Sequence, residues 1–108
     1  MERRRFPRYG CDFLAEIYET DAVTLLGIGN ILNIGKNCAG LETIVPFLVG
    51  QRFFVRFLDQ QRRQIAVEAI VRRLELHGLK RYYGIEFINI SEKDNSYLDQ
   101  IIGELGKK

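Results

Sequence analysis

Apolar and polar residues alternate along most of the first 90 positions of the chain. Residues 52–58 show the pattern clearly, because Phe53, Val55 and Phe57 fall on one face of an extended chain and Arg56 falls on the other. A two-residue period of this kind is typical of a β-strand with one buried face. Turn-forming residues interrupt the alternation at intervals of about 8–12 residues. The pattern predicts six strands, at residues 10–19, 23–32, 39–45, 52–58, 64–76 and 81–90.

The last part of the chain has a helical period instead. Ser91 is a typical N-cap residue, and the acidic residues Glu92 and Asp94 follow it, where the helix dipole favours negative charge. Apolar residues then recur at the spacing of one helix face, and Gly106 is a typical stop signal. We therefore predict an amphipathic helix over residues 92–105. Its expected apolar stripe consists of Tyr97, Ile101, Ile102 and Leu105.

These elements define the expected fold class, which is mainly all-β. Six short antiparallel strands over residues 10–108 predict a small barrel or sandwich, closed by the C-terminal α-helix. Side chains fill a barrel of this size, so a ligand must bind on its outside. Residues 1–9 show no apolar periodicity, and Pro7 disfavours helix at Phe6, so an extended, flexible basic arm is expected there. Functional residues are therefore expected at the rim, in the turns and in this arm.

A chain of 108 residues is long enough for one domain with one hydrophobic core. Hydrophobic residues make up 46% and charged residues 28%, which excludes a disordered or fibrous protein. No apolar run approaches the ~20 residues of a membrane-spanning helix, so no membrane insertion is expected. The N-terminus lacks the apolar segment of a signal peptide, and Cys11 and Cys38 form no disulfide framework. We expect a cytoplasmic protein with reduced thiols.

The positive charge is concentrated near the N-terminus. Residues 1–8 contain four arginines and one glutamate, whereas the other 100 residues contain 12 basic and 13 acidic side chains. This distribution favours a small anion site over a broad DNA-binding face. Arginine presents a planar fork of N–H donors that fits phosphate oxygens or the O6/N7 edge of guanine. The candidates are Arg3, Arg4, Arg5 and Arg8, with a solubilising or nonspecific polyanion-binding tail as the alternative.

Catalytic and metal-binding chemistry is sparse in this sequence. His77 is the only histidine, and it falls in a predicted hairpin turn over residues 77–80. One histidine and two separated cysteines do not supply a nucleophile–base pair or a tetrahedral metal site. Residues 27–29 (Gly-Ile-Gly) begin like a dinucleotide fingerprint, but Leu32 stands in place of the third glycine. We expect no enzyme, no metal ion and no cofactor.

Three segments together resemble the PilZ domain family. Residues 4–8 (RRFPR) directly precede the first strand and match the family's Arg-x-x-x-Arg motif. The predicted polar turn over residues 33–37, within 32–41 (LNIGKNCAGL), is similar to the family's second motif, Asp/Asn-x-Ser-x-x-Gly. Residues 83–87 (YGIEF) resemble a late strand of the family. The order of these segments and the terminal helix extend the resemblance over nearly the whole chain.

The resemblance implies a six-stranded PilZ-type β-barrel that binds cyclic di-GMP. In the family, arginines of the first motif hold phosphates and guanine edges, and the second motif cradles a guanine and a phosphate. By position, Arg4 and Arg8 match the first motif, and Arg3 and Arg5 are neighbouring candidates. Asn33 matches the Asp/Asn position, where a side-chain oxygen can accept a hydrogen bond from a guanine N–H.

The second motif departs from the family pattern at two positions. With Asn33 setting the register, Gly35 stands at the serine position and Cys38 at the glycine position. Gly35 has no hydroxyl, but its N–H is expected to allow close approach of an anion. Cys38 adds a Cβ, which is costly if that position needs a positive φ. A register that uses Gly40 as the motif glycine is two residues too long. Gly35 and Cys38 therefore stay candidate ligand-binding residues.

The function implied by the resemblance is non-catalytic signalling. Cyclic di-GMP would bind at the 33–38 turn, the arm would close over it, and the changed surface would act on a partner protein or support a homodimer. One alternative is a PilZ-fold interaction module that has lost nucleotide binding. Another is single-stranded nucleic-acid binding by the aromatics and arginines of residues 52–57 and 81–83, although such aromatics are more often core and no nucleic-acid partner is expected.

Overall fold

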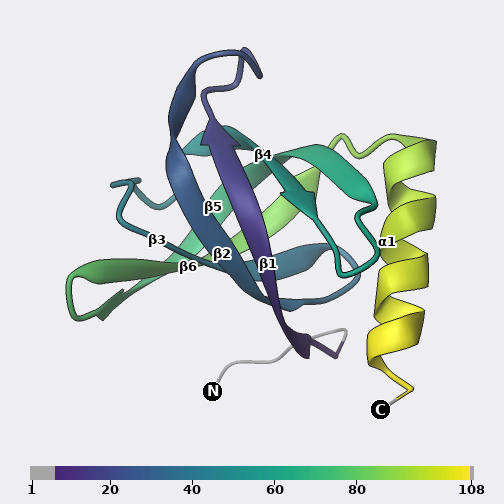
Figure 1. The fold of residues 1–108 in the computed structure, drawn as a ribbon. Coiled ribbons are helices and arrows are strands. Elements are labelled where there is room, and N and C mark those ends of the chain that lie inside the picture. The colour runs from purple at the N-terminus through teal and green to yellow at the C-terminus, as the bar shows by residue number, and fades with distance from the viewer. Residues whose placement is uncertain (1–6, 108) are drawn as a thin grey trace.

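The computed structural model describes residues 7–107, which form six strands and one helix (Figure 1). The strands are β1 (Tyr9–Tyr18), β2 (Leu25–Ile34), β3 (Cys38–Thr43), β4 (Arg52–Leu58), β5 (Gln64–His77) and β6 (Lys80–Ile88), and the helix is α1 (Glu92–Leu105). All six predicted strands are present, with ends that differ from the prediction by at most two residues. The helix has the predicted bounds.

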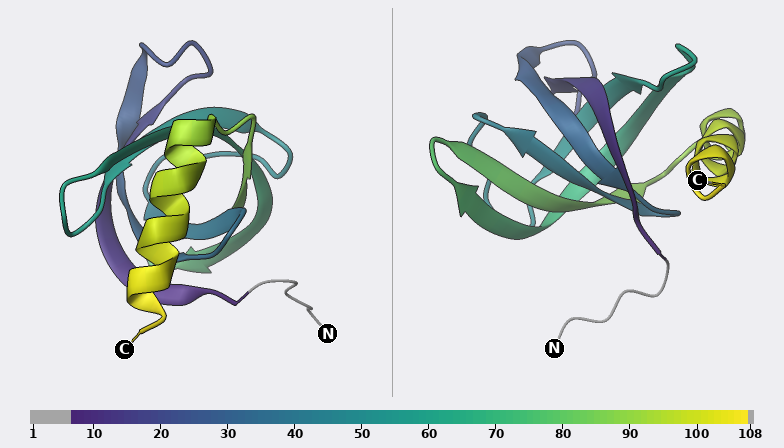
Figure 2. Two further views of the ribbon diagram at one scale, coloured as in Figure 1. Left: turned by 90° about the vertical axis from the view of Figure 1, so that its right-hand side faces the viewer. Right: turned by 60° about the horizontal axis from the view of Figure 1, so that its bottom comes forward.

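The six strands form a closed antiparallel barrel in the order β1-β2-β3-β6-β5-β4. Pairing of β1 with β4, for example of Ala15 with Phe57, joins the two ends of the sheet. Every strand therefore has two neighbours, and no long edge is left open. This closure decides between the barrel and the sandwich that the strand pattern allowed. Figure 2 shows α1 lying across one end of the barrel.

Apolar side chains fill the inside of the barrel. Alternate residues of β4 are buried while their neighbours are partly or fully exposed, as the two-residue period predicts. Tyr83 carries a hydroxyl into this core, where it donates to the Val45 carbonyl at 2.7 Å and accepts from the Phe47 N–H at 2.8 Å. The polar end of this ring is thus paired despite its burial. A filled interior leaves the outer surface for ligand binding.

The helix is capped as predicted, but its buried face differs from the prediction. The Ser91 side chain accepts the Asp94 N–H at 3.1 Å. The predicted stripe omitted Leu98, which is fully buried, whereas Tyr97 and Ile102 are only partly buried because they flank the line that faces the barrel. The buried line is Leu98, Ile101 and Leu105. Within residues 7–107, no helix has the length and apolarity needed to cross a membrane.

An ion-pair cluster fixes α1 to the turn between β4 and β5. The Arg63 guanidinium lies 2.6 Å from a carboxylate oxygen of Asp59 and 2.6 Å from one of Glu104 on the helix. The Asp59 carboxylate is fully buried and also accepts the backbone N–H groups of Gln61 and Arg63. Hydrogen bonds to Glu104 and then to Asp59 raise the pKa of Arg63 above its ordinary value. Arg63 therefore stays charged and links turn to helix.

Two residues that the sequence placed in turns lie in strands. Asn33 belongs to β2 and pairs with Gly10 on β1 and with Gly40 on β3, so the turn contains only residues 35–37. His77 is the last residue of β5 and pairs with Lys80 across a two-residue turn. The prediction of both turns was too long because a polar residue on the outer face of a strand looks like a turn residue in the sequence.

Replacing Arg63 by alanine should lower the free energy of unfolding by about 2–4 kcal/mol, because the buried Asp59 carboxylate loses its ion-pair partner. Urea denaturation followed by circular dichroism measures this loss. The control is Arg52→Ala, which removes an exposed arginine 3.8 Å from Glu68 and should change stability by no more than about 0.5 kcal/mol. Equal losses in the two variants would contradict a stabilising role of the Arg63 cluster.

Candidate functional site

The described end of the N-terminal arm meets the turn between β2 and β3. Arg8 Nη1 donates to Asn33 Oδ1 at 3.4 Å. The Pro7 carbonyl lies beside Gly35, where an added Cβ would be 2.9 Å from that oxygen. Cys38 begins β3 on the other side of the same turn. The structure thus brings together four of the residues predicted for the site. The other three, Arg3, Arg4 and Arg5, lie outside the described residues.

Both polar atoms of the Asn33 side chain are engaged. Its Nδ2 donates to the Tyr82 hydroxyl at 2.7 Å, while its Oδ1 accepts from Arg8. Because only the oxygen can accept a hydrogen bond, these two contacts assign the orientation of the amide. Oδ1 has a second lone pair, so it can also accept from a ligand. Asn33 therefore presents an acceptor next to the arginine arm.

Tyr82 was not among the residues predicted for the site. Its position beside Tyr83 in a strand rich in aromatics favoured a role in the core. Tyr83 lies in the core, whereas Tyr82 is outside the inner cluster and is still buried, at 8% exposed. The His77 ring stacks on it with centroids 5.2 Å apart. Its contact with Asn33 joins residues 49 positions apart. Only the pairing of β2, β3 and β6 reveals that contact, so no local sequence signal marks Tyr82.

Gly40 lies beneath the bond between Asn33 and Tyr82. It pairs with Asn33 on β2 and with Gly84 on β6. A Cβ at Gly40 would overlap the Tyr82 hydroxyl and lie 2.6 Å from Asn33 Nδ2. The missing side chain therefore allows the Tyr82 ring to cross β3 and reach Asn33.

The two departures from the family motif fit each other in space. The Gly35 N–H donates to the Cys38 carbonyl at 2.8 Å, so it is used within the turn rather than presented to an anion. Cys38 Sγ lies 3.3 Å from the place that a Cβ at Gly35 would take. The thiol would thus be in tight contact with a side chain at Gly35, and the Pro7 carbonyl oxygen, at 2.9 Å, would be closer still. Cys38 is not among the positive-φ residues of the described chain, so its Cβ causes no backbone strain.

The other candidates for chemistry, Cys11 and His77, lie on β1 and β5. Burial raises the pKa of the Cys11 thiol to about 12, and its Sγ donates to the Ile31 carbonyl at 3.4 Å. A thiol with this pKa is a poor nucleophile at neutral pH. The His77 ring lies 3.5 Å from carboxylate oxygens of both Glu42 and Glu75. Residues 7–107 contain no group of three or more His, Cys, Asp or Glu side chains that could hold a metal ion.

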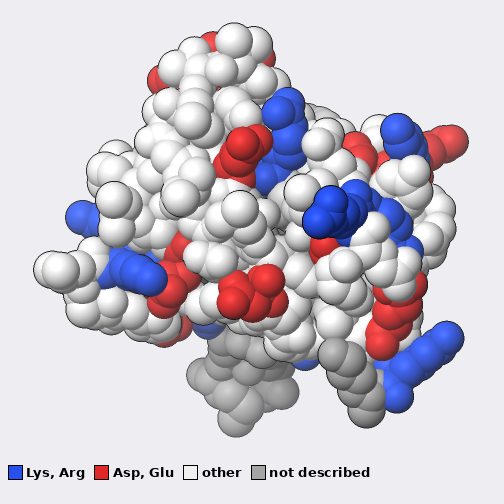
Figure 3. All heavy atoms as spheres, in the orientation of Figure 1, with Lys and Arg blue, Asp and Glu red and all other residues white. Residues whose placement is uncertain are grey.

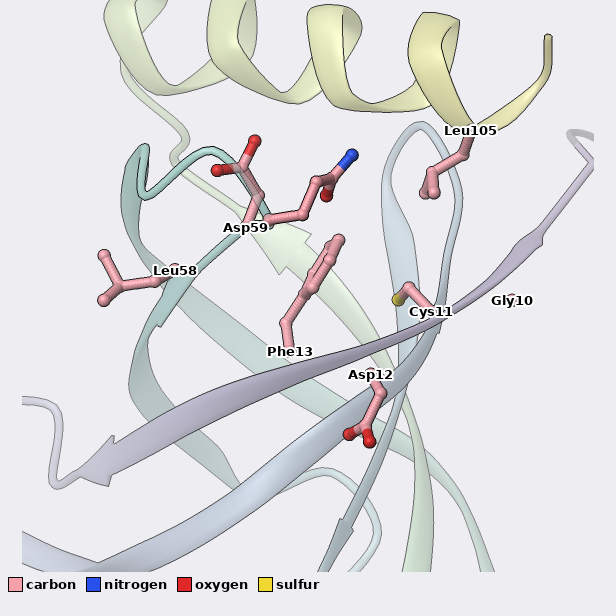
Figure 4. A pocket seen from close by; sticks show the side chains of 8 residues that line it. Gly10, Cys11, Asp12, Phe13, Leu58, Asp59 and Leu105 are labelled. Atoms are coloured by element: carbon pink, nitrogen blue, oxygen red, sulfur yellow. The ribbon is translucent and has the colours of Figure 1, made fainter. Parts of the chain in front are cut away.

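A pocket of about 280 Å³ opens between β1, the β4–β5 turn and the end of α1 (Figure 4). Its lining contains two acidic residues, Asp12 and Asp59, and no lysine or arginine that could bind a phosphate-bearing ligand. The full lining is Gly10, Cys11, Asp12, Phe13, Leu58, Asp59, Gln60 and Leu105. The arm and the β2–β3 turn are therefore the better anion site.

Charges of both signs are mixed on the face seen in Figure 3, which shows no broad basic surface there. Several arginines are paired with carboxylates, as Arg56 is with Glu16 at 3.7 Å and Arg72 with Glu86 at 2.7 Å. This mixture agrees with the nearly neutral charge of residues 9–108 and disfavours a nucleic-acid interface on that face.

A comparison with models of protein families matched the PilZ domain over residues 2–104. The match includes both segments that resemble the family motifs. A search of curated proteins gave no match.

Solved structures share the fold at low sequence identity. The Bacillus subtilis inhibitor of motility MotI/DgrA is similar with a TM-score of 0.78 at 21% identity, over 100% of this chain and 54% of that chain. The PilZ domain of Escherichia coli YcgR with c-di-GMP is similar with a TM-score of 0.74 at 18% identity, over 98% of this chain and 93% of that chain. The K. pneumonia MrkH–c-di-GMP complex is similar with a TM-score of 0.81 at 14% identity, over 99% of this chain and 54% of that chain. The present chain thus spans about half the length of MotI/DgrA and MrkH, and the likeness shows a PilZ-type barrel.

Gly40→Ala should lower the free energy of unfolding by about 1–3 kcal/mol, because the added methyl group displaces Tyr82 from Asn33. Gly103→Ala is the matched control. Gly103 lies within α1, and nothing stands within 4 Å of its added Cβ, so the same substitution should raise stability by about 0.5–1 kcal/mol. Urea denaturation gives both values. Effects of the same sign and size would show that the close packing at Gly40 is unimportant.

Proposed function

Because the chain belongs to the PilZ domain family, we propose that it is a cyclic di-GMP-binding signalling adaptor rather than an enzyme. PilZ domains are binding modules. The nucleotide lies against Asn33 and the turn at residues 35–38. Arginines of the N-terminal arm hold it from the other side: Arg3, Arg4, Arg5 and Arg8.

The observation that carries this proposal is the contact between Arg8 and Asn33. The two residues match different motifs of the family and stand 25 positions apart, yet their side chains are 3.4 Å apart. This contact places a guanidinium donor and an amide acceptor side by side outside the barrel. Together they are complementary to a phosphate oxygen and a guanine N–H. A hydrogen bond of this length is weak, so Arg8 loses little when it turns to a ligand phosphate.

Arginine contacts account for a large part of the binding free energy in this proposal. Each charge-assisted hydrogen bond contributes roughly 1.5–3 kcal/mol, so three of them supply much of the about −8 kcal/mol of a micromolar complex. Part of this gain is offset by the entropy lost when chain segments become ordered around the ligand. The names of two similar structures support the choice of nucleotide, because the YcgR domain and MrkH were both solved with c-di-GMP.

The residue that follows Arg8 lies beside the end of the helix. Tyr9 follows Arg8 and begins β1, and a Cβ at Gly106 would lie 3.5 Å from the Tyr9 ring. Movement of Arg8 onto a nucleotide therefore changes a surface made of the arm, Tyr9 and the end of α1. We assign this surface to recognition by a partner protein or a second copy of the chain.

One observation favours a second function, protein interaction without nucleotide. Gly35 offers no hydroxyl at the motif's serine position, and its N–H is already bonded to the Cys38 carbonyl. The turn therefore provides fewer ligand donors than the family motif implies. In this alternative the same barrel contacts a partner protein directly.

Isothermal titration of cyclic di-GMP into the full chain separates these functions. The proposal predicts saturable binding, which Arg8→Ala and Arg4→Ala each weaken about 10- to 100-fold by removing a charge-assisted contact. Arg52→Ala, which removes an equal charge on β4, should leave binding unchanged. GTP and a short single-stranded oligonucleotide serve as competing ligands.

Absence of heat with cyclic di-GMP in a folded chain would contradict the proposal and favour the interaction module. Tighter binding to the oligonucleotide, with a steep salt dependence, would indicate nucleic-acid binding instead.

A further inference from the structure

An irregularity in β5 places two consecutive arginines on the outside of the barrel. Its pairing with β6 shifts between Val71 and Arg73, so Arg72 is the additional residue of a β-bulge. Val71 and Leu74 both pack on the core side of the sheet. Strict alternation from Val71 would instead have directed Arg73 inward. Bulges redirect side chains in this way and are frequent next to functional sites.

Arg73 stands on the same row of the sheet as Asn33. Asn33 pairs with Gly40, Gly40 pairs with Gly84, and Gly84 pairs with Arg73. The row thus crosses three strand spacings, roughly 14 Å, between the two polar residues. Both residues between them are glycines, so no Cβ rises from this part of the row. The Tyr82 ring lies over Gly40 in this row.

The Arg73 side chain folds over β6, toward the side of the barrel that carries Asn33. A Cβ at Gly84 would lie 3.4 Å from Arg73 Cβ and 3.7 Å from its Nε. A guanidinium this close to the neighbouring strand lies along the sheet rather than extending into solvent. Glu75 Oε2, 3.4 Å from the same Nε, helps to hold it there. The Arg73 side chain is accordingly 35% exposed, whereas the Arg72 side chain is 59% exposed.

We propose that Arg73 is a further ligand contact, and that its fork binds the O6/N7 edge of one guanine of cyclic di-GMP. This inference rests on the function proposed above and names a residue outside both motif segments. A cyclic dinucleotide carries two bases on a ring that contains two phosphates. With the arm and Asn33 at one end of the ligand, a base at the other end extends over the glycine row toward Arg73. A planar arginine fork matches that base edge bidentately.

The test is isothermal titration of cyclic di-GMP into the full chain and three variants that keep the native urea midpoint. Arg73→Ala should weaken binding about 10- to 100-fold. Arg73→Lys keeps the charge but not the fork, and it should remain at least about 10-fold weaker than the wild type. Arg72→Ala is the matched control, since it removes the same charge from the same bulge. Arg72 is bonded to Glu86 at 2.7 Å, and its loss should change the affinity by less than about threefold.

The outcomes separate this inference from the proposed function. If the wild type binds and Arg73→Ala binds equally well, the role of Arg73 is overturned while the proposed function stands. Full recovery by Arg73→Lys would overturn the bidentate contact, and equal losses in Arg72→Ala and Arg73→Ala would show a general charge effect in place of a contact. No binding by the wild type would overturn the proposed function and this inference with it.

Discussion

Asn33 joins three parts of the molecule that are distant in the sequence. Its backbone pairs with β1 and β3, its Nδ2 binds Tyr82 on β6, and its Oδ1 meets Arg8 at the end of the arm. This arrangement depends on Gly40, because any side chain there would occupy the space of the Tyr82 hydroxyl. Since apolar side chains fill the barrel, the outer face around Asn33 is where these polar groups gather. The proposed nucleotide site is built on this one side chain and the arginine beside it.

The fold was predictable because its signals are local. Alternate burial along β4 and the Ser91 cap of α1 can be read from neighbouring residues, and both are confirmed. Closure into a barrel was not predictable from periodicity, since a sandwich has the same alternation; the pairing of β1 with β4 decides it. The missed burial of Leu98 has a similar cause, because the position of the helix over the barrel sets which of its apolar residues face inward.

The candidate site was predictable only in part, and for a physical reason. Motif resemblance identified Arg8 and Asn33, which the structure places in contact. It did not identify Tyr82 or Arg73, because their positions follow from strand register and from a bulge. It also treated Gly35 and Cys38 as two separate departures, whereas the structure shows that the Cys38 thiol occupies the space beside Gly35. Contacts between residues far apart in the chain are not visible in a single sequence.

The most direct test of the central claim is a two-dimensional ¹H–¹⁵N NMR titration of the labelled chain with cyclic di-GMP. We expect the largest shifts at the amides of Arg8 and Asn33 and in the turn at residues 35–38. The Asn33 side-chain NH₂ signals should move with them as the contact to Arg8 is exchanged for the ligand. Unchanged signals at these positions under saturating nucleotide, or shifts confined to the acidic pocket beside Asp12, would contradict the account.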